Sequence, residues 1–336
     1  MFDIQEQSLP SDSTPPLYGT EEHPVRYFGS LPLIRLRFQI RLPSSAKLPE
    51  YSGFAWRGLL GPAIQKLVCP FIQKPDCETD CLLKLHCPYP VLYRSKSSMS
   101  GQEEPPKGYV FFSPPSQVKN PLTLEITLFG SCCRFIPVLV ESVYAAGKMG
   151  LTKWRTPYDV LQWELITPQG VHRFTEARAV HRYQEHNLVF PLSTWMEEMP
   201  QFSGGVAHFI TPLCLRKEHR HLNQVDWTFF FDRLMNRLDS LNCQYNNRSP
   251  VDKGTKQEMK ERYSLWQPVR ENLRPLRLAR YSSTQNKKIN MNGLVGTVLL
   301  RNCSPELAAW WQLAGLVHVG KWTVMGMGKI VLETES

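Results

Sequence analysis

The sequence predicts an α+β protein of two tandem ferredoxin-like domains, because the order strand, helix, strand, strand, helix, strand can be read in the first half and the same order with one strand fewer in the second. Three observations carry this prediction. Residues 34–42 and 122–129 alternate apolar and polar side chains, as half-buried strands do. Residues 133–149 and 224–242 repeat apolar side chains at helical spacing. Hydrophobic residues make up 42% of the 336 residues, enough for the cores of about two domains.

The first domain is expected over residues 28–168. In "IRLRFQIRL", residues 34–42, the apolar side chains face a core while Arg35 and Arg37 belong to a basic outer row that suits a polyanion. A solvated edge is the alternative for that row. Ser52 is expected to cap the helix that follows. The remaining elements are expected at 109–113, 122–129, 133–149 and 158–166, in the order shared by RNA-recognition modules.

The second domain is expected over residues 169–336. Strands are predicted at 206–216, 293–300 and 329–333, and helices at 224–242 and from 305 onward. Ser304 caps the last helix, with Pro305 at its first position. Residues 246–258 are rich in polar side chains and are interpreted as a loop.

The remaining segments and the charge give further expectations. Residues 1–27 are interpreted as a disordered acidic tail without a secretory core, and residues 69–107 as a cysteine-rich insertion. No apolar run reaches the roughly 18 residues that a membrane span needs, which predicts a cytoplasmic protein with no membrane partner. The formal net charge is +9, of which +2 falls in residues 1–168 and +7 in the rest. This surplus indicates an anionic partner, most often nucleic acid.

The stretch "GLVHVGKWTVMGMGK", residues 315–329, resembles a phosphate-binding P-loop but lacks the Ser or Thr after its lysine and follows a helical segment. Nucleotide hydrolysis is therefore disfavoured. A phosphate of another kind remains a candidate ligand, because Gly320, Gly326 and Gly328 let backbone N–H groups approach an anion. Lys321 and Lys329 add positive charge. A glycine-rich turn between core elements is the alternative.

Residues 270–288 form a second basic stretch, "RENLRPLRLARYSSTQNKK". Arg277, Arg280 and Ser282 belong to a set of arginines, one tyrosine and hydroxyl side chains that fits contacts to an RNA backbone and stacking on its bases. A solvated charged loop is the alternative.

Nine histidines are present: His23, His86, His172, His181, His186, His208, His219, His221 and His318. RNA cleavage without a metal needs one group to take the proton of the 2′-hydroxyl, another to protonate the leaving oxygen, and cations near the phosphate. His318 is the candidate acid or base, because it stands two residues before Gly320 and could meet a phosphate held there.

Four cysteines, Cys69, Cys77, Cys81 and Cys87, lie within nineteen residues of the insertion. They could surround a tetrahedral structural zinc ion, although their spacing differs from the paired spacing of common zinc ribbons. Free thiols in a reducing cell are the alternative.

These motifs, in this order, resemble the CRISPR repeat-processing endoribonucleases of the RAMP superfamily, in the branch with a cysteine-bearing N-terminal domain. The likeness rests on four segments: "LPEYSGFAWRGLLGPAI", the cysteine cluster ending in Cys-Pro-Tyr, "RYSSTQNKKINMNGLVGTVLL" and "LAGLVHVGKWTVMGMGKIVL". It covers most of residues 28–333. Through it Arg57 and Gln285 join the candidate RNA-binding residues.

The resemblance implies a stem-loop CRISPR repeat RNA as substrate and cleavage that needs no cofactor, leaving a 2′,3′-cyclic phosphate and a 5′-hydroxyl. It also implies that the guide RNA passes to subunits of a CRISPR effector complex. A non-catalytic RAMP subunit that only binds guide RNA is the alternative.

One departure from the family concerns catalysis. Many members carry a catalytic histidine in the loop before the first helix, whereas here "PSSAKLPEYSG", residues 43–53, has none. That loop offers Lys47 and Tyr51. The expected catalytic residues are therefore His318, Lys321 and Tyr51.

Overall fold

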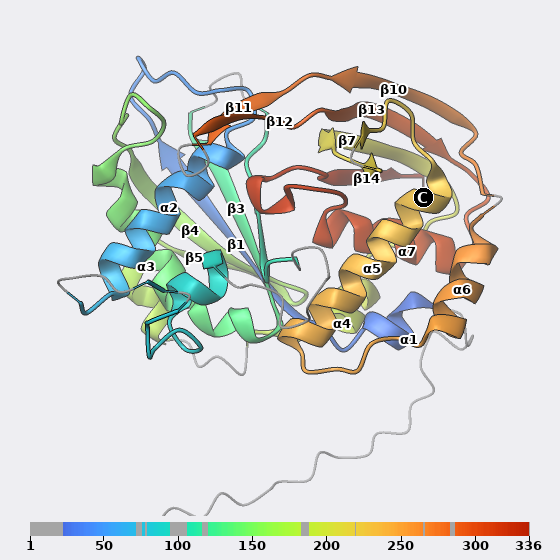
Figure 1. The fold of residues 1–336 in the computed structure, drawn as a ribbon, viewed down its shortest axis with the longest axis horizontal. Coiled ribbons are helices and arrows are strands. Elements are labelled where there is room, and N and C mark those ends of the chain that lie inside the picture. Colours follow the sequence, from blue (N-terminus) through green and yellow to red (C-terminus); the bar gives the residue numbers. More distant parts are fainter. Residues whose placement is uncertain are drawn as a thin grey trace, which may run out of the picture.

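The protein is described by a computed structural model over residues 23–335, apart from 72–75, 78, 95–105, 116–119, 183–187, 219, 265 and 283–285. Two antiparallel sheets lie side by side, each with its own pair of long helices (Figure 1).

The first sheet has the ferredoxin-like order. Its four principal strands run β2-β3-β1-β4, where β1 is Pro32–Arg41, β2 is Tyr109–Phe112, β3 is Leu122–Phe129 and β4 is Asp159–Thr167. The helices α2 (Gly53–Val68) and α3 (Ile136–Met149) connect them and pack on each other. All six elements were predicted. In β1 and β3 the buried residues are largely those of the alternating apolar pattern, and in α3 they are largely those of its apolar face.

The second sheet repeats this order as β10-β13-β7-β14. Its strands are β7 (Gly205–Leu213), β10 (Arg270–Leu276), β13 (Gly293–Leu300) and β14 (Ile330–Thr334), and its helices are α5 (Trp227–Tyr245) and α7 (Pro305–Val317). Two hairpins extend from it: β8 (Arg216–Lys217) with β9 (Arg220–His221), and β11 (Ala279–Ser282) with β12 (Lys287–Asn290). The prediction of two tandem ferredoxin-like domains is confirmed.

Several local predictions were wrong. Residues 24–27, expected in the disordered tail, belong to the short helix α1 (Pro24–Phe28), whose Phe28 is fully buried; residues 1–22 lie outside the described part. The expected loop 246–258 includes part of α6 (Lys253–Arg262), which begins where the Asp252 side chain accepts the N–H of Thr255 at 2.9 Å. Ser52 stands at the start of α2, but its side chain makes no capping hydrogen bond.

Strands after residue 168 also join the first sheet. β5 (Gly170–Phe174) pairs with β4, and β6 (Phe190–Pro191) pairs with β1 and leads into α4 (Leu192–Glu197). The domain boundary at 168 stays a prediction, whereas the first sheet itself extends to residue 191.

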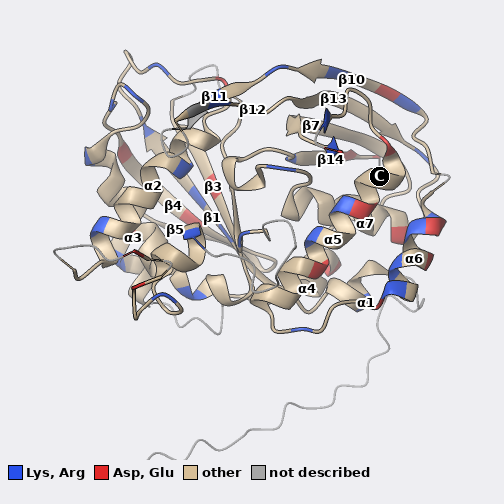
Figure 2. Cartoon of the chain, viewed as in Figure 1, with Lys and Arg blue, Asp and Glu red and all other residues tan. Residues whose placement is uncertain are grey.

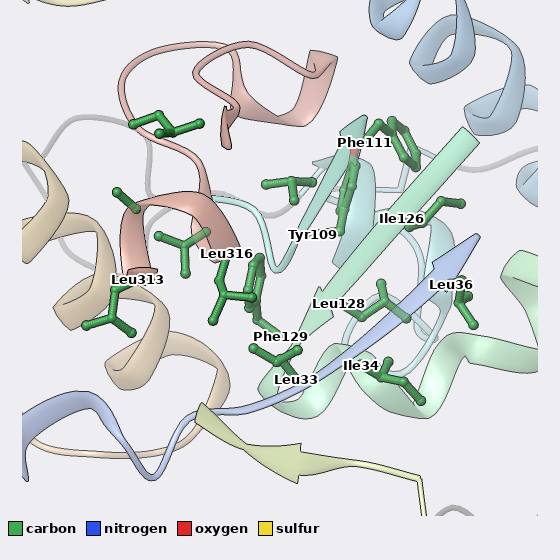
Figure 3. Packing of buried hydrophobic residues seen from close by; sticks show 14 of the residues in the cluster. Leu33, Ile34, Leu36, Tyr109, Phe111, Ile126, Leu128, Phe129, Leu313 and Leu316 are labelled. Atoms are coloured by element: carbon green, nitrogen blue, oxygen red, sulfur yellow. The ribbon is translucent and has the colours of Figure 1, made fainter. Parts of the chain in front are cut away.

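One apolar core runs through both halves. Leu316 of α7 lies next to Phe129 of β3, and Leu313 of α7 and Leu33 of β1 belong to the same buried cluster (Figure 3). Each of these four side chains is at most 5% exposed. The two sheets are therefore held together by buried apolar contacts.

Candidate nucleic-acid interface

The glycine-rich loop between α7 and β14 is closed by hydrogen bonds within the protein. Four of its N–H groups already have oxygen partners: Lys321 donates to the Cys214 carbonyl (2.9 Å), Gly326 to the Thr323 carbonyl (2.9 Å), Gly328 to the Pro212 carbonyl (3.0 Å) and Lys329 to the Thr211 hydroxyl (2.9 Å). These donors do not point at an open site. For these four N–H groups the structure favours the alternative, a turn between core elements, over a phosphate cradle.

The glycines serve this close packing. Gly320 has φ +91°, a region that favours glycine, and a side chain there would approach the Cys214 carbonyl oxygen to 2.7 Å. A side chain on Gly53, the first residue of α2, would collide with the Met325 carbonyl. The loop therefore locks the second domain onto the start of α2 in the first.

His318 is buried beneath this loop. The residue is 2% exposed, and its Nδ1–H donates to the Met327 carbonyl oxygen at 3.1 Å. Burial lowers the pKa of His318 well below its ordinary value, and the nearby positive charges of Lys329 and Arg237 lower it further. A neutral ring under the surface cannot exchange protons with RNA, so the geometry does not support a direct catalytic role for His318.

Lys329 is likewise turned inward. Its ammonium donates to the Gly315 carbonyl at 2.7 Å and lies 5.6 Å from the centre of the Phe112 ring. Burial, followed by the charge of Arg35, lowers the pKa of Lys329 to about 8. Lys329 therefore joins the two domains and does not face solvent as an RNA-binding lysine would.

The basic row of β1 is neutralised within the protein. Arg35 bonds to Glu125 at 3.2 Å, and Arg37 bonds to Glu125 at 2.9 Å and to Glu164 at 3.2 Å. The arginine side chains are only 21% and 33% exposed. The structure does not favour RNA binding by Arg35 and Arg37, because their guanidinium groups already form ion pairs with carboxylates on neighbouring strands.

A small apolar cluster joins the loop before α2, the glycine-rich loop and the base of the β11–β12 hairpin. We name it the interdomain cluster; its buried members are Tyr51, Cys214, Met291, Met325 and Met327. Tyr51 is 7% exposed. Burial, and then the neighbouring Glu50, raise the pKa of Tyr51 to about 12, although Arg274 acts in the opposite direction. Its hydroxyl is therefore protonated and can act only as a hydrogen-bond donor or acceptor.

Positive charge from both domains meets beside this cluster. Arg57 of α2 stacks its guanidinium 5.3 Å from the Tyr93 ring centre. Arg280 of β11 is half-buried, and burial together with the charge of Arg57 lowers the pKa of Arg280. Lys and Arg residues recur along β10 and the β11–β12 hairpin, which reaches toward α2 (Figures 1 and 2). An anion between Arg57 and Arg280 would relieve their repulsion.

The remaining predicted residues are Arg277, Ser282 and Gln285, predicted to bind RNA, and Lys321, predicted to be catalytic. Arg277 is exposed between β10 and β11, and Lys321 is half-buried next to Trp322. Ser282 lies in β11 opposite Lys287, but its side chain is not described, and Gln285 lies outside the described residues.

Sequence reasoning did not single out His221, which the structure places at this site. Its ring stacks on Trp322 of the glycine-rich loop, with ring centres 5.8 Å apart and planes inclined by 25°. Burial, and then Arg216, lower the pKa of His221, so a half-buried neutral imidazole is present at neutral pH. His221 lies in β9, a strand of two residues, which is too short to show a periodic pattern in the sequence. Its position next to the glycine-rich loop therefore becomes visible only in the folded structure.

The four cysteines of the insertion line one small cavity. As they stand, no three His, Cys, Asp or Glu side chains in the described ranges are arranged to hold a metal ion. The same ranges contain no helix long and apolar enough to cross a membrane.

Comparisons with known proteins match each half of the chain separately. Residues 31–188 match a family model described as an N-terminal domain. Residues 207–330 match the model of the CRISPR-associated endoribonuclease Cas6. An uncharacterized protein of Archaeoglobus fulgidus is 32% identical over 126 residues, which are 36% of this chain and 43% of that protein. The match thus spans less than half of that relative.

Solved structures share the whole fold. Thermus thermophilus Cas6 is 17% identical with a TM-score of 0.53, over 90% of this chain and 99% of that one. A Cas6 product complex, also 17% identical, gives a TM-score of 0.55 over 90% and 100%. A partial Cas6-RT-Cas1–Cas2 complex, 12% identical, gives 0.52 over 91% of this chain and 46% of that one. At these identities the likeness establishes the shared fold.

Proposed function

From the match of residues 207–330 to the model of the CRISPR-associated endoribonuclease Cas6, we propose that the chain is a protein of the CRISPR RAMP superfamily that binds CRISPR precursor RNA and cuts it within the repeats to release guide RNAs. The substrate is a repeat that folds as a stem-loop. The reaction takes place in the cytoplasm, and the product is handed to other subunits of a CRISPR effector complex.

One observation supports this proposal most directly: burial, and then the charge of Arg57 in the first domain, lower the pKa of half-buried Arg280 in the second, so two like charges from different domains repel each other. Arginine pairs of this kind bind phosphate through charge-assisted hydrogen bonds. Tyr93, stacked under Arg57, limits the positions of that guanidinium. RNA lying across both domains would thus have its backbone held at their junction.

The proposed chemistry is attack of a 2′-hydroxyl on the adjacent phosphorus without a metal cofactor. The neutral imidazole of His221 takes the proton of that hydroxyl, and the 2′-oxygen forms a bond to phosphorus while the bond to the 5′-oxygen breaks. The leaving 5′-oxygen takes its proton from a solvent water molecule, and the Tyr51 hydroxyl donates a hydrogen bond to that oxygen as the bond to phosphorus breaks. Arg57, Arg280 and Lys321 stabilise the charge that develops on the phosphate.

The alternative is a RAMP subunit that binds guide RNA without cutting it. It is favoured by the burial of His318 and by the lack of histidine in residues 43–53. Both candidates use the same RNA-binding surface, and they differ only in the outcome of incubation with substrate.

The test is incubation of the purified protein with its cognate repeat RNA in EDTA. We expect one cut per repeat, a 2′,3′-cyclic phosphate on the upstream product and a 5′-hydroxyl on the downstream one. Tight binding with uncut RNA would favour the alternative. Cleavage that appears only after Mg²⁺ is restored would contradict the metal-independent chemistry.

A further inference from the structure

The cysteine-rich insertion brings four thiols to the lining of one small cavity. Cys69, Cys77, Cys81 and Cys87 all line a cavity of about 10 Å³. A space of this size holds a single water-sized occupant. Apart from the thiols, its walls include the apolar side chains of Phe71 and Leu83. The cavity thus combines four soft ligands with an otherwise largely apolar lining.

The backbone brings these thiols together. Cys69 ends α2, where its N–H donates to the Gln65 carbonyl at 3.0 Å. Cys81 is held in a turn by the Asp76 carbonyl at 3.0 Å, and the Cys87 N–H donates to the Leu83 carbonyl at 2.8 Å. Two successive turns therefore return the chain to the end of the helix where it began.

Little apolar burial stabilises this arrangement. Leu82 is 94% exposed and Leu85 is 72% exposed, although both lie between the second and fourth cysteines. Phe71 is 40% exposed. The described residues from Cys69 to Cys87 thus leave large apolar side chains in water, and small segments with little apolar burial are commonly stabilised by a metal or by disulfides.

All four cysteines are free thiols in the structure. Thiolates select soft or borderline ions, and four of them match tetrahedral Zn²⁺. We propose that Cys69, Cys77, Cys81 and Cys87 bind one structural Zn²⁺ that closes the insertion onto the end of α2. As they stand, the thiols are not arranged to hold an ion, so binding draws the sulfur atoms inward to about 2.3 Å from the metal. Metal binding and ordering of the insertion are thereby one event.

The first experiment measures the metal directly. The full chain, purified from zinc-supplemented cells, is expected to carry about one Zn²⁺ per chain. After replacement by Co²⁺ it should show intense thiolate-to-cobalt charge-transfer absorption with the visible bands of tetrahedral cobalt. No bound metal, or a cobalt spectrum without thiolate bands, would overturn the proposal.

Paired variants assign the ligands. Cys77→Ser and Cys81→Ser should each lose the stoichiometric metal, whereas Cys243→Ser, a half-buried cysteine of α5, should retain it. If the ligand variants do not fold, the cobalt spectrum of the unaltered chain still decides the question. Limited proteolysis should cut within residues 69–94 faster after chelation. The site lies outside the proposed RNA-cleaving residues, so its failure would leave the cleavage proposal intact.

Discussion

The Nδ1 atom of His318 lies 3.1 Å from the carbonyl oxygen of Met327, so the imidazole ties the end of α7 to the far side of the glycine-rich loop. His318 has φ +58°, an unusual conformation for a residue other than glycine. The loop it stabilises packs on α2 of the other domain. We therefore expect this histidine to contribute to stability and to positioning, as the first prediction states.

His318→Ala should destabilise the protein by about 1–3 kcal/mol, because the Met327 carbonyl loses its partner in a buried place. Denaturant unfolding measures the loss. Under conditions where the variant is fully folded, single-turnover cleavage should proceed at a rate within a few-fold of the unaltered protein. A fully stable variant that does not cleave would instead restore His318 as the acid or base.

Lys329 predicts a pH dependence of stability. The pKa of Lys329 is lowered from its ordinary 10.5 to about 8 in the folded protein, so between these pH values the unfolded chain binds more protons. The free energy of unfolding therefore rises with pH from about 8 to 10.5. Below pH 8 both states carry the proton on Lys329, and the full unfavourable free energy of burying its charge is present. Between these pH values the free energy of unfolding of the unaltered protein should rise relative to that of Lys329→Met. Lys260→Met, at an exposed position of α6, should give a flat difference.

Arg57 and Arg280 should act on the same phosphate. Each single change to Ala is expected to weaken repeat-RNA binding about tenfold and to reduce the steepness of the salt dependence by about one unit. The double variant should lose less than the two single losses combined, because both groups serve one contact. Arg248→Ala, an exposed arginine after α5, is the matched control and should bind normally. Fully additive losses would indicate two independent contacts.

His221→Ala should slow cleavage by about 10²–10⁴-fold while repeat-RNA affinity changes little. The acidic limb of the pH–rate profile should lie below the ordinary histidine value of 6.5, because the pKa of His221 is lowered. Added imidazole should restore part of the rate. His172→Ala, on the exposed strand β5, should cleave normally. An unchanged rate for His221→Ala would remove His221 from the mechanism.

Tyr51→Phe separates hydrogen bonding from proton transfer. The pKa of Tyr51 is about 12, so the hydroxyl stays protonated over the working pH range. Loss of the hydroxyl should lower the cleavage rate by on the order of 10² without moving either limb of the pH–rate profile. A moved limb would show that Tyr51 itself titrates during the reaction.

The fold could be predicted wherever one element carries its own pattern. β1 and β3 alternate, and Ser304 caps α7 by accepting the Leu307 N–H at 3.3 Å. β10 was missed because it is an exposed edge strand with several charged side chains and no apolar alternation. Its strand conformation comes from backbone pairing with β13. α6 was missed because it buries little besides Met259.

The candidate site was less accessible to sequence reasoning, since its residues meet only through the tertiary fold. Arg57 and Arg280 were each named as RNA-binding, a role that stays a prediction, but their proximity could not be read from positions 223 residues apart. Lys329 and Arg35 look like surface cations in the sequence. In the structure Lys329 is buried against the neighbouring domain, and Arg35 is paired with the carboxylate of Glu125.

The apolar contacts between α7 and the first sheet have a consequence for how the two halves can exist. If either half were made alone, Leu33 and Phe129, or Leu313 and Leu316, would form an apolar surface exposed to water. Such a surface favours aggregation over folding. The duplicated architecture therefore forms one cooperative folding unit, and a single heat-absorption peak in calorimetry is its expected signature.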